Sequence, residues 1–430
     1  MKVLFITPLP PPVHGSAMVS QYIKDSRLVQ ETFDCDFVNL STSRRMDEIG
    51  KGGVKKLLRF VGAYLALLWK LLTRRYDLCY LAITCHGVGF LKDAPFVLLC
   101  KLFGRKVLIH QHNKGMSRYV DRWPYRWLLP LVYRNTTVML LSWHLYPDIE
   151  RVVRREQVVV CANGIPKVTI NDERLTLNED SHPDGNAKHY TLDTQQELSH
   201  TDCTENSGIA ENTIQRELDT ITQNTPCCAR VGLPDGNSKP STLNSKPEKE
   251  ARLLFLSNLI PSKGVYVLLD ACRMLRERGV PFACDFVGGE TKEIDRAAFE
   301  NAVHERALEG MVCYQGPKYG EEKERYWQKA DVFVQPTYED CFPLTIVEAM
   351  QHGKPVVSTD EGAVPDLVKD GENGFVCPRQ DAHALSDALE RLITDPALRR
   401  QMGEAGYARY KELYTLEAFE RRFVKCLVPI

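Results

Sequence analysis

Short, nearly continuous apolar runs alternate with longer amphipathic stretches in the first and last parts of the chain. Such runs are typical of parallel strands that helices cover on both faces. They predict strands at 2–7, 35–40, 77–82, 106–110, 138–142, 158–162, 252–257, 282–289, 311–316, 331–336 and 355–359, with a last strand after the turn DGENG at 370–374. The order strand, helix, strand, repeated over two regions, predicts an α/β protein made of two doubly wound, Rossmann-like domains.

The residues from 171 to 250 interrupt this pattern. They contain a single aromatic residue, Tyr190, few aliphatic residues and many Asn, Asp, Thr, Ser and Gln. A segment of this composition cannot bury enough apolar surface to offset the entropy lost on ordering. We therefore predict domains at 1–165 and 251–430, separated by a polar, disordered insertion at 166–250. A last helix near 415–428 is expected to pack back on the first domain.

The formal net charge of −1 conceals an uneven distribution. Residues 1–170 carry 25 Lys and Arg against 12 Asp and Glu, residues 171–250 carry 7 against 15, and residues 251–430 carry 23 against 29. The basic first part favours an anionic partner. The 14 cysteines are scattered without a CxxC spacing, and the first residues lack the apolar core of a secretion signal. We therefore expect reduced thiols and a cytoplasmic protein.

Two carboxylates in the stretch YEDCFPLTIVEAMQHGKPVV, which begins at Tyr338, are the most informative residues for function. Asp340 is expected in a loop just before a helix, and Glu348 about one and a half turns inside that helix. Both then point to the carboxyl ends of parallel strands, where open α/β sheets bind ligands. Carboxylates at this place can accept hydrogen bonds from the vicinal hydroxyls of a sugar. Taken alone, the pair is better explained as an N-cap Asp and a solvated helix Glu.

A candidate anion site lies upstream, in SNLIPSKGVYVLLD. Ser262, Lys263 and Gly264 stand between a predicted strand and an amphipathic helix. Backbone N–H groups at a helix start, together with one ammonium group, suit a phosphate. A lone Lys-Gly pair is a weak signal, because it is more often part of an exposed turn. Downstream, GAVPDLVKDGENG predicts a loop at Gly362, a short helix and a turn before the last strand.

In this order and spacing, SNLIPSKG, ADVFVQPTYEDCFPLTIVEAMQHGKPVV and GAVPDLVKDGENGF resemble the nucleotide-sugar domain of family 4 glycosyltransferases. The resemblance covers 251–430, and the first part is similar more loosely, through PPPVHGSAM and KVLIHQHN. It implies the GT-B architecture, in which two Rossmann-like domains face each other across a cleft. It also implies a retaining transferase that takes a sugar from a nucleotide-diphosphate donor and uses neither a cofactor nor a metal ion.

The resemblance assigns roles to particular residues of this chain. Asp340, His112 and Lys263 are the catalytic candidates: Asp340 near the reacting carbon of the donor sugar, His112 facing sugar and acceptor, and Lys263 on the diphosphate. Glu348 is expected to bind the ribose hydroxyls, and Gly15 to let a helix N-terminus approach the phosphates. The remaining donor contacts are expected from Asn258, Leu344 and Thr345.

Two departures from the family pattern affect this assignment. Asp340 stands where the family usually has Glu, so the carboxylate lies one methylene further back. Ser257-Asn258-Leu259 stands where the family usually has Gly-Arg-Leu, so a cation is missing near the diphosphate. Lys318, in GPKYG, is a candidate to replace that cation.

Other functions are weighed against the same residues. The triplet DCD at 34–36 matches the DxD motif used for metal–nucleotide binding, but it opens a predicted strand far from any phosphate motif, so surface carboxylates are favoured. His110 and His112 lack a third ligand at a suitable spacing, which disfavours a metal site. The absence of GxGxxG disfavours a dinucleotide oxidoreductase. A nucleotide-sugar epimerase of the same architecture, and a non-catalytic sugar-nucleotide-binding or scaffold protein, remain open alternatives.

A basic segment at 51–76 carries seven Lys and Arg and no acidic residue, together with Phe60, Tyr64 and Trp69. Its apolar core is shorter than the roughly 20 residues that span a bilayer. It predicts either a helix lying on an anionic membrane surface or one packed on the sheet with its basic face in water. A similar segment at 118–135 favours membrane contact. We therefore expect a protein peripheral on the inner face of the cell membrane, a glycan or polyprenyl-linked acceptor as in surface polysaccharide assembly, and no nucleic acid partner.

Overall fold

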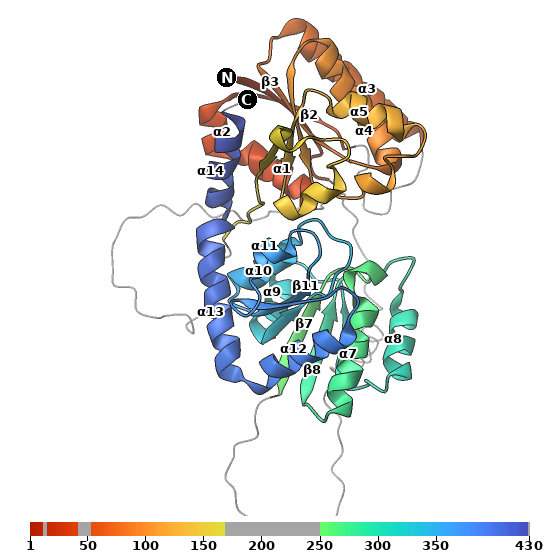
Figure 1. Cartoon of the computed structure of the whole chain (residues 1–430), viewed down its shortest axis with the longest axis vertical. Coiled ribbons are helices and arrows are strands. Elements are labelled where there is room, and N and C mark those ends of the chain that lie inside the picture. The colour runs from red at the N-terminus through yellow and green to blue at the C-terminus, as the bar shows by residue number, and fades with distance from the viewer. Residues whose placement is uncertain (12–14, 42–52, 168–249, 429–430) are drawn as a thin grey trace, which may run out of the picture. The chain divides into compact units, whose positions relative to one another are not determined.

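The computed structural model of the chain describes residues 1–11, 15–41, 53–167 and 250–428. Apart from its first two residues and its last one, the predicted insertion at 166–250 lies outside the described residues, and the domain boundaries stay a prediction. Figure 1 shows two parallel sheets, each flanked by helices. No helix in the described ranges combines the length and the apolar character that crossing a membrane takes.

The first sheet has six parallel strands in the order β2-β1-β3-β4-β5-β6. Its strands are β1 (Lys2–Thr7), β2 (Asp34–Asn39), β3 (Leu78–Ile83), β4 (Lys106–Gln111), β5 (Thr137–Leu140) and β6 (Val158–Val160). The chain therefore starts one strand in from an edge, adds the edge strand β2 and then crosses back past β1 to build the other side, as a doubly wound sheet does.

The second sheet has six parallel strands in the order β12-β11-β10-β7-β8-β9. Its strands are β7 (Ala251–Leu256), β8 (Phe282–Val287), β9 (Val312–Gly316), β10 (Val332–Val334), β11 (Val356–Thr359) and β12 (Gly374–Cys377). Two six-stranded parallel sheets of Rossmann type confirm the predicted α/β fold class.

Alternate residues of the first sheet enter two different cores. Leu4 and Ile6 face the core built with α3 (Val54–Thr73), α4 (Gly87–Leu102) and α5 (Tyr125–Tyr133). Val3 and Phe5 face the core built with α1 (Gly15–Asp25), α2 (Arg27–Thr32) and α14 (Leu416–Leu427). The last helix of the chain thus packs on the first sheet, with the ring centroid of Phe423 5.4 Å from that of Tyr80. Short 3-10 helices complete this part at Met116–Arg118 (η2), Trp143–Asp148 (η3) and Arg155–Gln157 (η4).

Helices cover the second sheet on both faces as well. The face of Leu253 and Phe255 packs against α7 (Val265–Glu277), α8 (Arg296–Glu305) and α12 (Ala382–Thr394). The face of Leu254 and Phe333 packs against α9 (Gly320–Lys329), α10 (Leu344–Gln351), α11 (Val364–Leu367) and α13 (Pro396–Leu413). The remaining element is the 3-10 helix η5 (Pro261–Lys263).

Local sequence determines where several of these helices begin. The Asp295 side chain accepts a hydrogen bond from the backbone N–H of Ala298, Asp381 from Ala384, and Thr415 from Ala418. Asp395 caps α13, whose first residue is Pro396. Each cap satisfies a backbone donor that has no partner inside the helix.

Candidate active site

The candidate site is built from the loops that follow β7, β10 and β11. These strands are neighbours in the second sheet, so their carboxyl ends meet at one edge. Gly264, with φ +86°, lies at the start of α7, and a Cβ atom there would stand 2.1 Å from the backbone oxygen of Pro336. Only glycine permits both the conformation and this close approach. The loop that carries Lys263 is therefore held against the loop that follows β10.

This contact brings together the predicted cation and the first predicted carboxylate. Lys263 Nζ lies 2.6 Å from Asp340 Oδ2 and 3.4 Å from the backbone oxygen of Glu339. The backbone oxygen of Ser262 accepts hydrogen bonds from Thr337 Oγ1 at 3.1 Å and from the Tyr338 backbone N–H at 2.9 Å. The Lys263 and Asp340 side chains are only 21% and 15% exposed. The ammonium and the carboxylate therefore form a shielded ion pair at the carboxyl edge of the sheet.

Replacing Gly264 by alanine tests this packing. We expect Gly264→Ala to lower the free energy of unfolding by about 1 kcal/mol or more beyond the effect of Gly279→Ala. Gly279 is a matched control, because its φ of +73° is similar but nothing lies within 4 Å of an added Cβ. Thermal and urea unfolding of both variants measure the difference. Equal destabilisation would show that the Pro336 contact does not constrain the loop.

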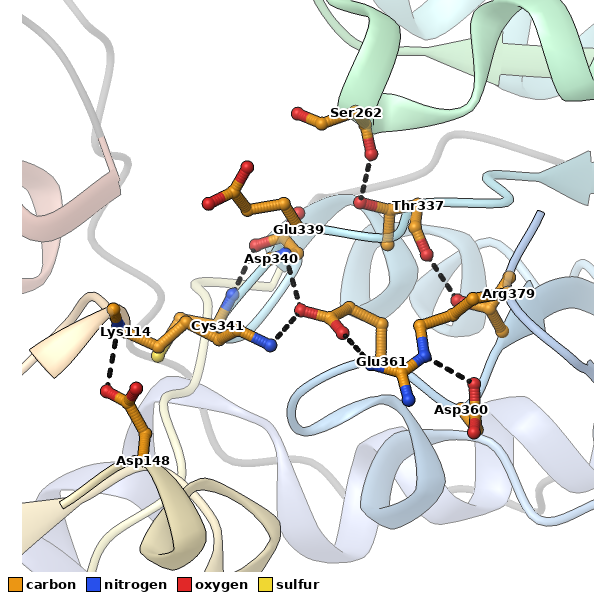
Figure 2. Close-up of polar contacts among 12 residues, drawn as sticks. Lys114, Asp148, Ser262, Thr337, Glu339, Asp340, Cys341, Asp360, Glu361 and Arg379 are labelled. Atoms are coloured by element: carbon orange, nitrogen blue, oxygen red, sulfur yellow. Dashed lines mark hydrogen bonds and ion pairs between the residues drawn. The ribbon is translucent and has the colours of Figure 1, made fainter. Parts of the chain in front are cut away.

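A buried carboxylate, Glu361, joins three elements of the site (Figure 2). Its side chain is fully buried. Glu361 Oε1 accepts hydrogen bonds from the Asp340 backbone N–H at 3.1 Å and from Lys114 Nζ. Glu361 Oε2 lies 3.1 Å from Arg379 Nη1, and Arg379 Nε lies 3.1 Å from Asp360 Oδ1. Because a buried charge is stable only when it is paired and hydrogen-bonded, these partners make the buried carboxylate possible.

Lys114 reaches Glu361 from the loop after β4, in the first part of the chain. That loop is held by Asp148, whose Oδ2 accepts hydrogen bonds from the backbone N–H groups of Gly115 at 2.8 Å and Met116 at 3.0 Å. On the other side, an added Cβ on Gly362 would lie 2.4 Å from the Asp340 backbone oxygen. The loops after β10 and β11 are thus pressed together around the Glu361 carboxylate.

Sequence reasoning missed Lys114, Glu361 and Arg379. Lys114 stands two residues after His112, but no local spacing connects it with Glu361, 247 positions away. The predicted replacement for the missing cation, Lys318, lies 3.9 Å from Glu322 in its own segment. The cations that the structure places around the Asp340 loop include Lys263, Lys114 and Arg379, and Arg118 Nη1 lies 2.8 Å from Glu339 Oε1 in that loop.

The helix α10 carries three further predicted residues, Leu344, Thr345 and Glu348. Glu348 Oε2 lies 3.0 Å from Lys323 Nζ of α9, and Thr345 Oγ1 donates a 2.6 Å hydrogen bond to Gln335 Oε1. Leu344 lies against Gly15, the first residue of α1, since an added Cβ there would be 3.7 Å from Leu344 Cδ1. Burial, and next the charge of Glu348, raise the pKa of Tyr22 in α1 to about 12. The Tyr22 phenol therefore stays protonated near Glu348.

His112 and Asn258 lie in the loops after β4 and β7. The ring centroids of His112 and His110 are 4.0 Å apart, and His110 Nδ1 lies 2.5 Å from the Tyr80 hydroxyl. Burial, and next the charge of His112, hold the pKa of His110 well below its ordinary value, so His110 is neutral at pH 7. Asn258 Oδ1 accepts a 3.0 Å hydrogen bond from the Gly289 backbone N–H, which ties the loop after β7 to the loop after β8.

Residues 241–409 match the family model of glycosyl transferases group 1. The amylovoran biosynthesis glycosyltransferase AmsK of Erwinia amylovora is 33% identical over 147 residues, which are 33% of this chain and 35% of AmsK. The matches to the first four curated relatives cover between 35% and 44% of those proteins' own length.

Two solved structures share the fold over the whole chain. Sucrose-phosphate synthase from Thermosynechococcus elongatus superposes with a TM-score of 0.66 and 18% identity, covering 100% of this chain and 99% of that one. Anabaena HepE, in complex with UDP, superposes with a TM-score of 0.64 and 15% identity, covering 100% of both chains. These structures confirm the predicted GT-B fold, and the family match confirms the predicted resemblance to glycosyltransferases. The narrower assignment to family 4 stays a prediction.

Proposed function

We propose that this chain transfers a sugar from a nucleotide-diphosphate donor to a glycan or lipid-linked acceptor, with retention of the anomeric configuration. The observation that carries the proposal is the shielded contact between Lys263 and Asp340, next to the helix that bears Glu348. A cation beside the site of a diphosphate and a carboxylate beside the site of a sugar are what this reaction requires. The UDP bound by HepE supports a nucleotide donor here.

In the proposed reaction, an acceptor hydroxyl oxygen bonds to the anomeric carbon of the donor. The bond from that carbon to the diphosphate breaks, and the hydroxyl proton passes to the leaving diphosphate. Lys263 stabilises the negative charge that grows on the diphosphate, which is the largest catalytic effect we assign. Asp340 contacts the donor sugar, and His112 faces the sugar and the acceptor. Glu348, with Thr345, Leu344, Asn258 and Gly15, holds the donor.

We propose that the transfer needs neither a metal ion nor an organic cofactor, because Lys263 supplies the positive charge for the diphosphate. We further propose that the acceptor is an intermediate of surface polysaccharide assembly, linked to a polyprenyl lipid at the inner face of the cell membrane. Support comes from AmsK, whose name places it in amylovoran biosynthesis, and from the excess of basic residues in 1–170. The sugar transfer then takes place in the cytoplasm.

The donor site is tested with a panel of UDP-, GDP- and ADP-sugars, measured for binding and for slow hydrolysis. We expect one donor to bind saturably, and Glu348→Ala to weaken it about tenfold to hundredfold, since a hydrogen bond to a charged group contributes about 1.5–3 kcal/mol. The matched control is Glu412→Ala, an exposed glutamate of α13. EDTA should leave the hydrolysis rate unchanged.

The other outcomes discriminate between functions. Release of a sugar nucleotide with an altered sugar would favour an epimerase. Binding without turnover, even with polyprenyl-linked sugars as acceptors, would favour a non-catalytic scaffold. If no donor of the panel binds, Asp340 and Asn258 do not form a donor site.

A further inference from the structure

The helix α3 has two apolar faces, and the residues that the structure describes cover only one of them. Leu67 and Leu71 are buried against the first sheet, and Phe60, Ala63 and Tyr64 pack beside them. At 100° per residue, the exposed apolar residues form a second arc of about 120° beside the covered one. Its large apolar side chains are 42–74% exposed: Val54, Leu57, Leu58, Val61, Leu65, Trp69 and Leu72. A surface helix of a globular protein normally carries polar residues on that face.

A second helix adds exposed apolar groups on the same side of the sheet. Trp123, Trp127 and Leu131, in α5 and just before it, are 80%, 65% and 54% exposed. The helices α3, α4 and α5 all pack on the sheet face of Leu4 and Ile6, so their outer surfaces belong to one layer (Figure 1). Large exposed apolar surfaces on a soluble protein mark interaction sites.

The charges of this layer define its partner. Residues 53–134 carry 15 Lys and Arg against 3 Asp and Glu. Four of these cations pair with acids outside this range: Lys70 and Arg74 with Asp36, Lys114 with Glu361, and Arg118 with Glu339. The other 11 still outnumber the three acids, of which Asp93 is buried and Asp121 is paired with Arg151. The guanidinium of Arg126 lies over the ring of Trp127, 4.9 Å from its centroid. Apolar side chains with Trp, bordered by cations, match an anionic lipid surface, whose headgroups attract the cations and whose acyl region accepts the apolar groups.

We infer that the outward face of α3, together with Trp123, Trp127 and Leu131, docks this chain on an anionic membrane, with α3 lying in the plane of the interface. A second copy of the chain fits less well, because joining two such layers would bring two excesses of positive charge together. The inference deepens the proposed function, which has a lipid-linked acceptor, but the binding itself needs neither donor nor acceptor.

The test is flotation of the full-length chain with vesicles of phosphatidylcholine, alone or with about 30% phosphatidylglycerol, a content chosen to give a surface potential that attracts Lys and Arg. The wild type should bind the anionic vesicles at least tenfold better, and less well as salt rises. The double variant Leu58→Glu/Leu65→Glu should lose this binding at least tenfold. Both side chains are more than half exposed, so the fold should persist, which circular dichroism and thermal unfolding verify.

The control is Val428→Glu, which introduces one Glu, half the charge change of the double variant, at a 60% exposed position following α14, on the opposite side of the first sheet. It should bind vesicles like the wild type. Equal binding by the double variant, or no binding by the wild type, would overturn the inference. A concentration-dependent dimer that the double variant abolishes, without vesicle binding, would assign the face to a second copy instead. Donor hydrolysis, measured in the same variants without lipid, tells whether the transferase site is intact.

Discussion

Replacing Lys263 by alanine is expected to lower kcat for sugar transfer by about 10²–10³, the usual effect of removing one group that stabilises developing charge in a transition state. The effect should fall on kcat more than on donor affinity, because the charge on the diphosphate grows as the glycosidic bond breaks. In the wild type the Lys263 ammonium lies 2.6 Å from the Asp340 carboxylate. The variant Lys263→Ala removes this cation and leaves Asp340 without it beside the proposed site of the diphosphate. Steady-state kinetics with the donor found in the panel measure both constants.

The control for this variant is Lys292→Ala, which removes an exposed lysine from the same half of the chain. Adding Asp340→Asn to Lys263→Ala separates two roles of the lysine. If Lys263 only neutralises Asp340, the double variant should regain the rate of Asp340→Asn alone. That recovery would contradict a direct role on the diphosphate, whereas a persistent loss would support it.

Replacing Glu361 by alanine should cost both stability and activity. Removing one member of a buried ion pair destabilises a protein by about 3–5 kcal/mol, because the remaining charge stays buried. We expect about 3 kcal/mol here, the low end, since Lys114 and Arg379 side chains are 24% and 49% exposed and can turn towards water. The Asp340 backbone N–H also loses its acceptor, so the Lys263–Asp340 pair should shift and kcat should fall by at least tenfold.

Urea unfolding and steady-state kinetics measure the two effects separately. Glu361→Gln keeps the shape and one acceptor oxygen, so it should recover part of the activity even if stability stays low. The exposed Glu372 provides a control, and Glu372→Ala should leave both quantities unchanged. Unaltered stability of Glu361→Ala would mean that the carboxylate does not hold the loops after β10 and β11 together.

Most of the fold could be predicted from local sequence. All eleven strands predicted with bounds are present, and each observed boundary lies within two residues of the predicted one. The strand expected after DGENG is β12, which begins at Gly374. Prediction succeeded because continuous apolar runs of four to eight residues, bounded by turns, are a local property of strands buried on both faces.

The candidate site was predictable only in part. Lys263, Asp340 and Glu348 lie in short motifs, and the structure brings Lys263 and Asp340 into contact because their strands, β7 and β10, are neighbours. The second apolar face of α3 was visible only as a basic, aromatic segment. Leu67 and Leu71 pack against the sheet and cover one face of the helix. The spacing of residues along 51–76 does not show which face is covered.

The sequence by itself determined the two parallel sheets, the order of their strands along the chain, and the motifs of the candidate donor site, since each depends on residues close together in the chain. Tertiary structure alone decided that Glu361 is buried and that Lys114, 247 positions away, and Arg379 surround it. The reason is physical: a carboxylate can be buried only where cations and N–H groups converge on it, and that convergence arises from the meeting of loops that are distant in sequence.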